Sequence, residues 1–187
     1  DADKLAFRRD AHEYRNLLMT EQPNEDYAVT MGRQFFFDVY HYFTLKSLTE
    51  SSDERIAGIA AKALKEVTYH LRRSSEWVKR FGDGTEESHR RMQDAVDILW
   101  RFTGELITPD DTDRVMAEAG IGPDTDQLAK DWRGMVNEVL TQATLTPGAE
   151  DAWMYMGGKH GEHTEHLGFI LAEMQFLQRA YPDATTW

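Results

Sequence analysis

Apolar residues recur every three or four positions along several stretches of the chain, a spacing that predicts amphipathic helices. The clearest stretch runs from Asp53 to Arg80. Ser51, Ser52 and Asp53 offer side-chain oxygens for an N-cap, and Gly82 allows the chain to leave the helical conformation afterwards. We therefore predict a long central helix over residues 53–80. Its apolar positions are Ile56, Ile59, Ala60, Ala63, Leu64, Val67, Leu71, Trp77 and Val78.

The remaining stretches also have helical spacing, and none shows the alternation typical of a strand. Thr85 is the predicted N-cap of the third long helix, and Thr125 or Asp126 caps a later one. We predict an all-α fold, a single domain over residues 1–187 in which the helices pack through short loops. The further predicted helices are a short one with an irregular tail within Asp1–Glu21, then Glu25–Ser47, Thr85–Ile107, Asp110–Ala119, Thr125–Ala143 and Glu162–Ala180.

The composition narrows the possible functions. With 187 residues, 41% hydrophobic and 11% aromatic, the chain can build a core and is not globally disordered. The net charge of −12 argues against nucleic acid as the main partner, because phosphate binding needs a basic face. The chain has no cysteine, which excludes disulfides, thiolate zinc sites and iron–sulfur clusters. No apolar run is long enough for a membrane span, so we expect a cytoplasmic protein that does not bind membranes.

Three polar residues fall at positions predicted to face the bundle interior. His70 lies within the apolar stripe of the central helix, and Glu66 lies at the edge of that stripe, one turn before His70. Asp38 faces the core from the helix Glu25–Ser47. Carboxylates and imidazoles inside a helical bundle are the ligands of di-iron sites, which use the spacing Glu-x-x-His. Here Tyr69 occupies the third position after Glu66, and the histidine comes fourth. The spacing favours a structural pair over a metal site and leaves the metal site open.

A second run of metal-capable side chains lies near the C-terminus, and it comprises His160, Glu162, His163, Glu165 and His166. It contains His-x-x-His but lacks Glu-x-x-His, so it is a weak indication of a metal site. A helix start that docks on a partner is the favoured interpretation.

Phosphate binding is a further possibility at two places. The segment Gly157-Gly158-Lys159-His160-Gly161 precedes a predicted helix, where free backbone N–H groups and a lysine can receive a phosphate. It is not a Walker loop, and a flexible helix entry is the favoured interpretation. Arg72 and Arg73 belong to a small basic group in an acidic chain, which is either a solvated face or a contact for a polyphosphate tail.

Several longer motifs carry a resemblance that extends from about Leu5 to Trp187. The chain resembles the C-type subunits of the bacterial phenylacetyl-CoA 1,2-epoxidase (phenylacetate-CoA oxygenase) family. The motifs are Glu21-Gln22-Pro23-Asn24, Lys65-Glu66-x-x-Tyr69-His70-Leu71, Leu99-Trp100-Arg101-Phe102-Thr103-x-Glu105-Leu106, Gly157-Gly158-Lys159-x-Gly161-x-His163-Thr164-Glu165-His166-Leu167-Gly168 and Leu171-Ala172-Glu173-Met174-Gln175-x-Leu177-Gln178-Arg179.

The resemblance implies a ferritin-like bundle acting as the structural subunit of a multicomponent monooxygenase in phenylacetate degradation. It implies a hetero-oligomer with a catalytic A-type subunit that carries the di-iron centre and binds most of the phenylacetyl-CoA, with no cofactor in this chain. The family has two further core helices before residue 1, which we expect to be absent here. The alternative is that the chain is itself a catalytic ferritin-like di-iron oxidase.

The resemblance also assigns expectations to single residues. Asp38, Glu66, Tyr69 and His70 are expected to mark a degenerate metal site that binds no metal, with no catalytic residue in the chain. Lys159, Arg72 and Arg73 are candidates for contacts to the CoA phosphates or to a partner, and His163, Glu165 and His166 are expected at a subunit interface.

Overall fold

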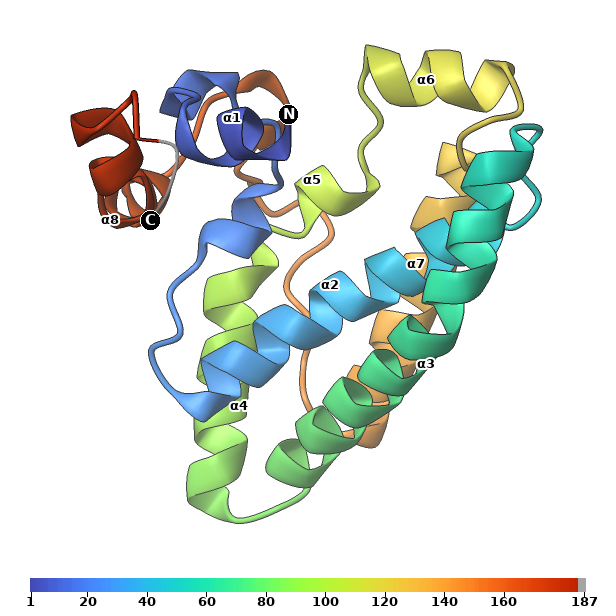
Figure 1. Ribbon diagram of the computed structural model, residues 1–187. Coiled ribbons are helices and arrows are strands. Elements are labelled where there is room, and N and C mark those ends of the chain that lie inside the picture. Colours follow the sequence, from blue (N-terminus) through green and yellow to red (C-terminus); the bar gives the residue numbers. More distant parts are fainter. Residues whose placement is uncertain (185–187) are drawn as a thin grey trace. The chain divides into compact units, whose positions relative to one another are not determined.

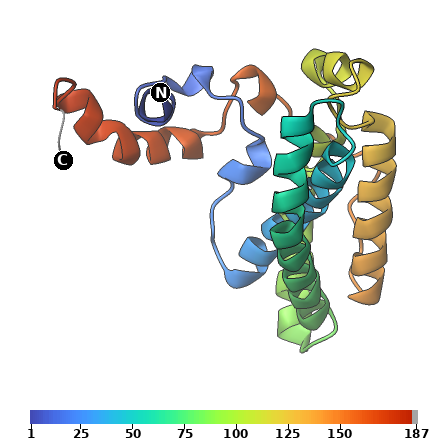
Figure 2. The same ribbon diagram turned by 45° about the vertical axis from the view of Figure 1, so that its right-hand side comes forward.

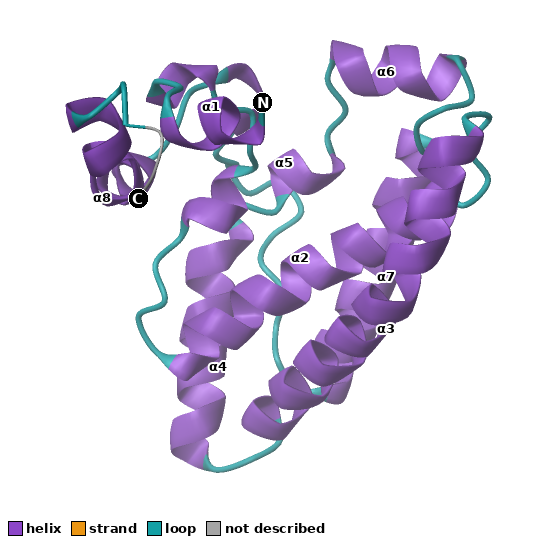
Figure 3. Ribbon diagram, viewed as in Figure 1, coloured by secondary structure: helices purple, strands orange, loops and turns teal. Residues whose placement is uncertain are grey.

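A computed structural model describes residues 1–184, and all regular elements in this range are helical (Figure 3). The prediction of an all-α fold is confirmed. The chain divides into two compact units, which we call the terminal unit (Asp1–Pro23 with Met156–Trp187) and the central unit (Asn24–Tyr155). The predictions of one domain over residues 1–187 and of two absent preceding helices stay predictions.

The central unit is built around one helix that contacts most of the others. The helix α2 packs against α3, α4, α5 and α7, and α6 packs against α7 (Figures 1 and 2). The helices of this unit are α2 (Tyr27–Leu48), α3 (Glu54–Gly82), α4 (Glu86–Trp100), α5 (Gly104–Ile107), α6 (Asp111–Glu118) and α7 (Thr125–Gln142).

Side-chain caps fix where the helices of the central unit begin. Asp53 Oδ1 accepts hydrogen bonds from the backbone N–H groups of Arg55 and Ile56, at 2.9 and 3.1 Å, and so starts α3 as predicted. Thr85 caps α4, also as predicted. The cap of α7 is Asp124, one residue before the predicted candidates. Each cap accepts hydrogen bonds from backbone N–H groups that have no partner within the helix. A cap of this kind stabilises the helix by about 1 kcal/mol.

The core of the central unit lies where α2, α3, α4 and α7 meet. Trp132 on α7 is almost fully buried, and its Nε1–H donates to the backbone oxygen of Phe36 on α2 at 3.0 Å. Each fully buried large apolar side chain contributes roughly 1.5–3 kcal/mol to stability. Fully buried apolar residues of this core include Phe35, Phe36, Val39, Val78, Met92, Ala95, Val96, Leu99, Trp132, Val136 and Leu140.

The predicted continuous helix over Thr85–Ile107 is wrong, because the chain breaks between α4 and α5. The backbone N–H and the hydroxyl of Thr103 both lie within hydrogen-bonding distance of the Trp100 oxygen, at 3.0 and 2.8 Å. The Arg101 oxygen accepts instead from Tyr155 N–H at 2.8 Å, a residue far along the chain. This contact uses a carbonyl that a continuous helix would pair internally, so the interruption depends on tertiary structure.

The terminal unit joins the two ends of the chain. The buried amide of Gln175 on α8 donates from Nε2 to the backbone oxygen of Arg9 and to the hydroxyl of Tyr14. Arg179 pairs with Asp10 at 2.8 Å. α8 begins three residues later than the predicted start at Glu162. The elements of this unit are α1 (Ala2–Phe7), the 3₁₀ turns η1 (Ala11–Glu13), η2 (Leu18–Glu21) and η3 (Gly158–His160), and α8 (Glu165–Ala180).

Within the part of the chain that the structure describes, every helix is too short or too polar to cross a lipid bilayer.

Gly82, the last residue of α3, lies against the end of α7. A Cβ at this position would come within 2.2 Å of the Ala143 oxygen and 2.9 Å of the Ala143 Cβ. The Gly82 oxygen accepts from His89 Nδ1 at 2.7 Å and from Thr144 Oγ1 at 3.3 Å. The end of α3 is therefore held close to α4 and to the end of α7.

We expect Gly82→Ala to lower the free energy of unfolding by about 1–3 kcal/mol, because the added methyl group displaces backbone rather than a flexible side chain. The matched control is Gly58→Ala in α3, where a Cβ would meet nothing within 4 Å. This change should raise the free energy of unfolding by about 0.5–1 kcal/mol through helix propensity. Urea denaturation measures both, and equal effects at the two glycines would contradict the close approach.

Candidate functional site

The polar centre of the central unit is Asp38, which lies on α2 and faces α3. Only 1% of the residue is exposed. Gln34 Nε2 donates to Oδ1 at 2.6 Å, and Ser74 Oγ on α3 donates to Oδ2 at 2.8 Å. Both carboxyl oxygens therefore accept from protein donors, which is the condition for burying such a group at tolerable cost.

Two histidines influence this carboxyl group electrostatically. Burial raises the pKa of Asp38. The hydrogen bonds from Ser74 and Gln34 and the charges of His70 and His41 lower this pKa, but by less than burial raises it. Burial also lowers the pKa of His41, with Asp38 opposing that shift and His70 adding to it. Burial thus disfavours the charged form of both groups, as it does wherever solvent is excluded.

The Glu66–His70 pair lies at the surface of α3. His70 Nε2 is 3.9 Å from Glu66 Oε1, and 45% and 78% of the His70 and Glu66 side chains are exposed. The prediction that His70 lies inside the buried stripe is wrong. The buried stripe of α3 runs through Ala60, Val67 and Leu71, and a residue next to Leu71 is turned about 100° away from it.

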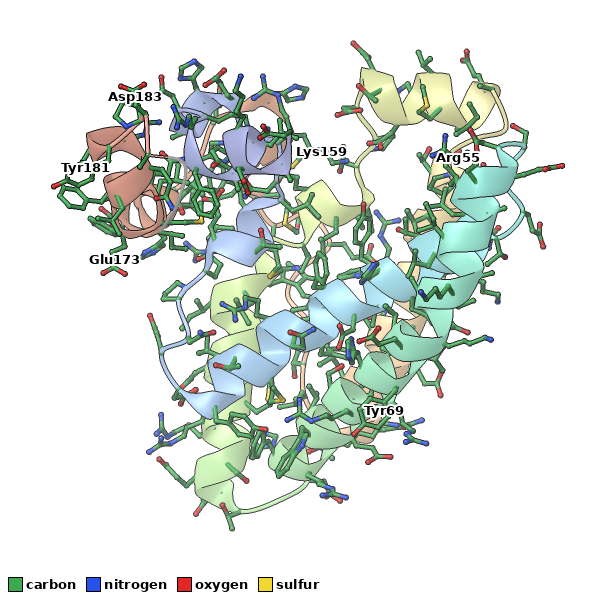
Figure 4. All side chains as sticks on the ribbon, viewed as in Figure 1. Arg55, Tyr69, Lys159, Glu173, Tyr181 and Asp183 are labelled. Carbon is green, nitrogen blue, oxygen red and sulfur yellow. The ribbon has the colours of Figure 1, made fainter. Side chains whose placement is uncertain are left out.

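Tyr69 is also exposed on α3, where it takes part in a small cationic and aromatic group (Figure 4). The guanidinium of Arg72 lies 5.4 Å from the centre of the Tyr69 ring, a distance at which a cation attracts the ring face. Arg73 Nη2 donates to Tyr27 Oη at 3.3 Å. The third predicted phosphate contact, Lys159, belongs to the terminal unit. No single unit therefore contains all three basic residues.

Within residues 1–184, no group of three or more His, Asp or Glu side chains is arranged to hold a metal ion. The predicted metal-capable residues are instead divided among different surroundings. Asp38 is bound by Gln34 and Ser74, whereas Glu66 and His70 form an exposed pair.

The terminal unit contains a second polar centre, in which Glu21 and His163 pair away from solvent. Their side chains are 2% and 4% exposed, and His163 Nδ1 is 2.6 Å from Glu21 Oε1. His163 Nε2 lies 3.1 Å from the Tyr14 oxygen. Asn16 Nδ2 donates to Glu21 Oε1 at 2.7 Å, and the backbone N–H and hydroxyl of Thr164 donate to Oε2 at 2.8 and 2.7 Å.

The groups around this pair show which atoms can donate and which can accept. The Tyr14 oxygen can only accept, so Nε2 of His163 carries a hydrogen. A second hydrogen must lie between Nδ1 and Glu21, and three further donors surround the carboxyl group. Every polar atom of the two side chains therefore has a hydrogen-bond partner within the terminal unit.

Sequence reasoning placed His163 at a subunit interface and did not single out Glu21 as its partner. The side chain of His163 is occupied within the terminal unit. Glu165 is exposed in the first turn of α8, and the half-buried His166 ring lies 6.4 Å from the Phe169 ring. The motif Glu21-Gln22-Pro23-Asn24 indicated that Glu21 matters, but it did not indicate the partner of Glu21. A pair of residues 142 positions apart leaves no local pattern in the sequence.

Comparison with known proteins agrees with the resemblance inferred from the motifs. The sequence profile of the phenylacetic acid catabolic protein family matches residues 1–187. The chain belongs to this family. It is also 47% identical over 182 residues to the C-type subunit of 1,2-phenylacetyl-CoA epoxidase from Escherichia coli strain K12, a match that covers 97% of this chain and 73% of that protein. The resemblance to C-type subunits is confirmed.

In this member of the family, the buried carboxyl of Asp38 predicts a definite pH dependence of stability. Because burial raises its pKa, the folded chain holds a proton more strongly than the unfolded chain. The contribution of Asp38 to stability is therefore greatest below the unfolded pKa of about 4 and declines as the pH rises through the higher folded pKa. Asp38→Asn removes the buried charge and keeps an acceptor for Gln34, and its new N–H₂ group can donate to Ser74 Oγ while that hydroxyl donates to the Leu71 oxygen.

We expect Asp38→Asn to be at least as stable as the original chain at pH 7, with the difference shrinking toward pH 4. Asp38→Ala should cost about 1–3 kcal/mol, because Gln34 and Ser74 then lose their partner. Denaturant unfolding at several pH values measures this, with Asp151→Asn at an exposed loop as control. A loss for Asp38→Asn that grows from pH 4 to pH 7 would refute the assignment.

The Glu21–His163 pair predicts a local effect in the terminal unit. Glu21→Ala or His163→Ala should each destabilise it by roughly 1–3 kcal/mol, because either leaves buried hydrogen-bonding groups without a partner. The double variant should cost less than the sum. Amide hydrogen exchange is the measurement, with faster exchange expected in residues 11–23 and 158–175. Glu165→Ala, at an exposed site, is the control, and strictly additive losses would show that the two residues do not interact.

Proposed function

We propose that this chain is the non-catalytic structural subunit of a multicomponent di-iron monooxygenase that epoxidises phenylacetyl-CoA, and that it supports a catalytic A-type subunit. The observation that carries the proposal is the 47% identity to the C-type subunit of the E. coli epoxidase, across almost the whole chain. In this proposal the partner holds the iron and binds most of the CoA ester, and the present chain shapes the partner through helix–helix contacts.

The arrangement of polar side chains supports the absence of a metal site in this chain. A di-iron site of the ferritin-like type needs carboxylates and histidines from four helices, all directed to one point. Here Asp38 uses both oxygens for Ser74 and Gln34, and Glu66 and His70 project to solvent as a pair of side chains 3.9 Å apart. These donor groups do not fit a di-iron centre as they stand.

The surface of α8 supports an assembly role. α8 buries Leu167, Leu171 and Gln175, yet large apolar side chains on other faces of the same helix are exposed. A helix that is apolar on most faces is typical of a buried helix, and exposed apolar patches mark contact surfaces. The exposed residues are Phe169, Ile170, Phe176, Leu177 and, just after the helix, Tyr181.

Reconstitution with the catalytic subunit tests the proposal. We expect iron to be bound by the catalytic subunit and not by this chain. Epoxidation of phenylacetyl-CoA should fall at least tenfold when this chain is left out. The double variant Glu66→Gln/His70→Asn removes the metal-capable pair and should leave iron content and turnover within about twofold of the original complex.

Two results would contradict the proposal. The first is stoichiometric iron in this chain that the double variant loses, which would favour a catalytic di-iron oxidase. The second is full turnover by the catalytic subunit without this chain. The matched control is Glu54→Gln, an exposed carboxylate in the first turn of α3.

A further inference from the structure

One carboxylate on α8 is surrounded by apolar side chains. On the surface of a helix, the nearest neighbours of a residue are those three and four positions before and after it. For Glu173 these neighbours are Phe169, Ile170, Phe176 and Leu177, which are all large and apolar. Between 50% and 64% of each of these four residues is exposed, and Glu173 is exposed as well. Glu173 therefore has no neighbour on its own helix with which it could form an ion pair.

These five residues, which we call the outer face of α8, lie on the side of the helix opposite its buried stripe. Successive residues of a helix are rotated by about 100°, which places Glu173 roughly opposite Leu167, Leu171 and Gln175. Figure 4 shows the side chains of Glu173 and Tyr181 projecting outward from α8. Burial of the opposite stripe holds α8 in the terminal unit, and the outer face stays exposed to solvent.

The spacing of the apolar residues suits a second helix laid along α8. Phe169 and Phe176 are seven residues apart, and so are Ile170 and Leu177. Each pair therefore spans about 10 Å along the helix axis, and the two pairs lie on either side of Glu173. Apolar residues at seven-residue intervals are the contacts that nearly parallel helices use when they pack.

A partner that covers this face must neutralise Glu173. An ionised carboxylate inside an apolar contact is costly unless a cation or a hydrogen-bond donor pairs with it. Since the four neighbours of Glu173 offer only hydrocarbon and aromatic surface, the pairing group must come from the partner. A lysine or arginine in the middle of an apolar helix face supplies it, and the surrounding apolar contacts then exclude water from the ion pair.

Charge also argues against two other occupants. In a symmetric antiparallel pair of α8 helices, each Glu173 would face its own copy, because it lies at the midpoint of the four apolar residues. Two like charges in an apolar contact repel each other. A lipid surface is also a poor occupant, since helices that lie on membranes are rich in lysine and arginine. α8 has no lysine, and its one arginine, Arg179, pairs with Asp10.

We infer that the outer face of α8 docks one helix of a different protein, which presents an apolar face with a lysine or arginine opposite Glu173. The apolar side chains supply most of the affinity, and the ion pair selects the partner and fixes its register. This inference rests on the proposed structural role, because it names the surface through which the chain contacts the catalytic subunit.

Calorimetric titration of the full chain with the catalytic subunit tests the inference. We expect a dissociation constant below about 1 μM for the original pair. Ile170→Ser and Leu177→Ser should each weaken binding at least tenfold, with the helical circular dichroism retained because both residues are exposed. The matched control is Ile98→Ser, which removes an isoleucine of similar exposure (47%) on α4 and should leave the affinity within twofold.

Replacement of Glu173 by methionine tests the ion pair itself. Glu173→Met leaves the cation of the partner buried without its carboxylate, and should weaken the complex at least tenfold. A tighter complex would show that the partner is apolar at this point, which would overturn the inference. Glu173→Lys should weaken binding at least a hundredfold. Glu138→Lys, the same change at an exposed position within α7, is the control and should stay within twofold.

The inference and the proposed function can fail separately. A complex that forms normally, but in which the α8 variants behave like the two controls, would overturn the inference and leave the proposed function standing. If the catalytic subunit does not bind the chain at all, both are refuted.

Sedimentation and vesicle binding test the other two occupants. We expect the chain alone to form no dimer that Leu177→Ser dissolves, and we expect no binding to vesicles of phosphatidylglycerol and phosphatidylcholine. A dimer or a vesicle complex that depends on Leu177 would assign the outer face to a second copy or to a lipid surface, and would overturn the inference.

Discussion

The arrangement of the central unit depends on the burial of α2. This helix contacts α3, α4, α5 and α7, so it must be apolar on several sides, and Phe35, Phe36 and Val39 meet that requirement. The one acidic side chain of α2, Asp38, is buried among the same contacts. A carboxyl group there is stable only if its oxygens find donors, and Gln34 and Ser74 supply them. A carboxyl group that could have served as a metal ligand is here part of the packing between two helices.

The terminal unit meets a similar requirement with different groups. Glu21 comes from a 3₁₀ turn near the start of the chain and His163 from the entry to α8, and together they satisfy each other and the oxygen of Tyr14. Glu21 also accepts from both the backbone and the hydroxyl of Thr164, the N-cap residue of α8. The start of α8 is thus set by a glutamate 143 positions away. In both units a buried charge-bearing group fixes how elements meet.

The sequence predicted those features that local chemistry determines. Asp53 and Thr85 cap the helices they were expected to cap, because the N-cap preference needs only the residues that follow. The all-α fold followed from spacing alone. The break after Trp100 was missed because Tyr155, far along the chain, takes the carbonyl of Arg101. The exposure of His70 was missed because a position within a helical stripe is buried only where another helix packs against it.

The candidate site was predictable only in part. Glu66, Tyr69 and His70 were found from their spacing, and the structure places them together on one exposed stretch of α3. Asp38 was correctly expected in the core, but its partners were not identified. Gln34 lies one turn before Asp38 on the same helix, a spacing that permits the pair, whereas Ser74 comes from α3 and has no local signal.

Anomalous diffraction at the iron absorption edge, from crystals of the proposed complex with the catalytic subunit, tests the central claim most directly. We predict that every iron peak lies in the catalytic partner and that the density beside Asp38 is explained by Gln34 and Ser74 alone. Two iron peaks lodged between α2 and α3, within bonding distance of Asp38, Glu66 or His70, would contradict it.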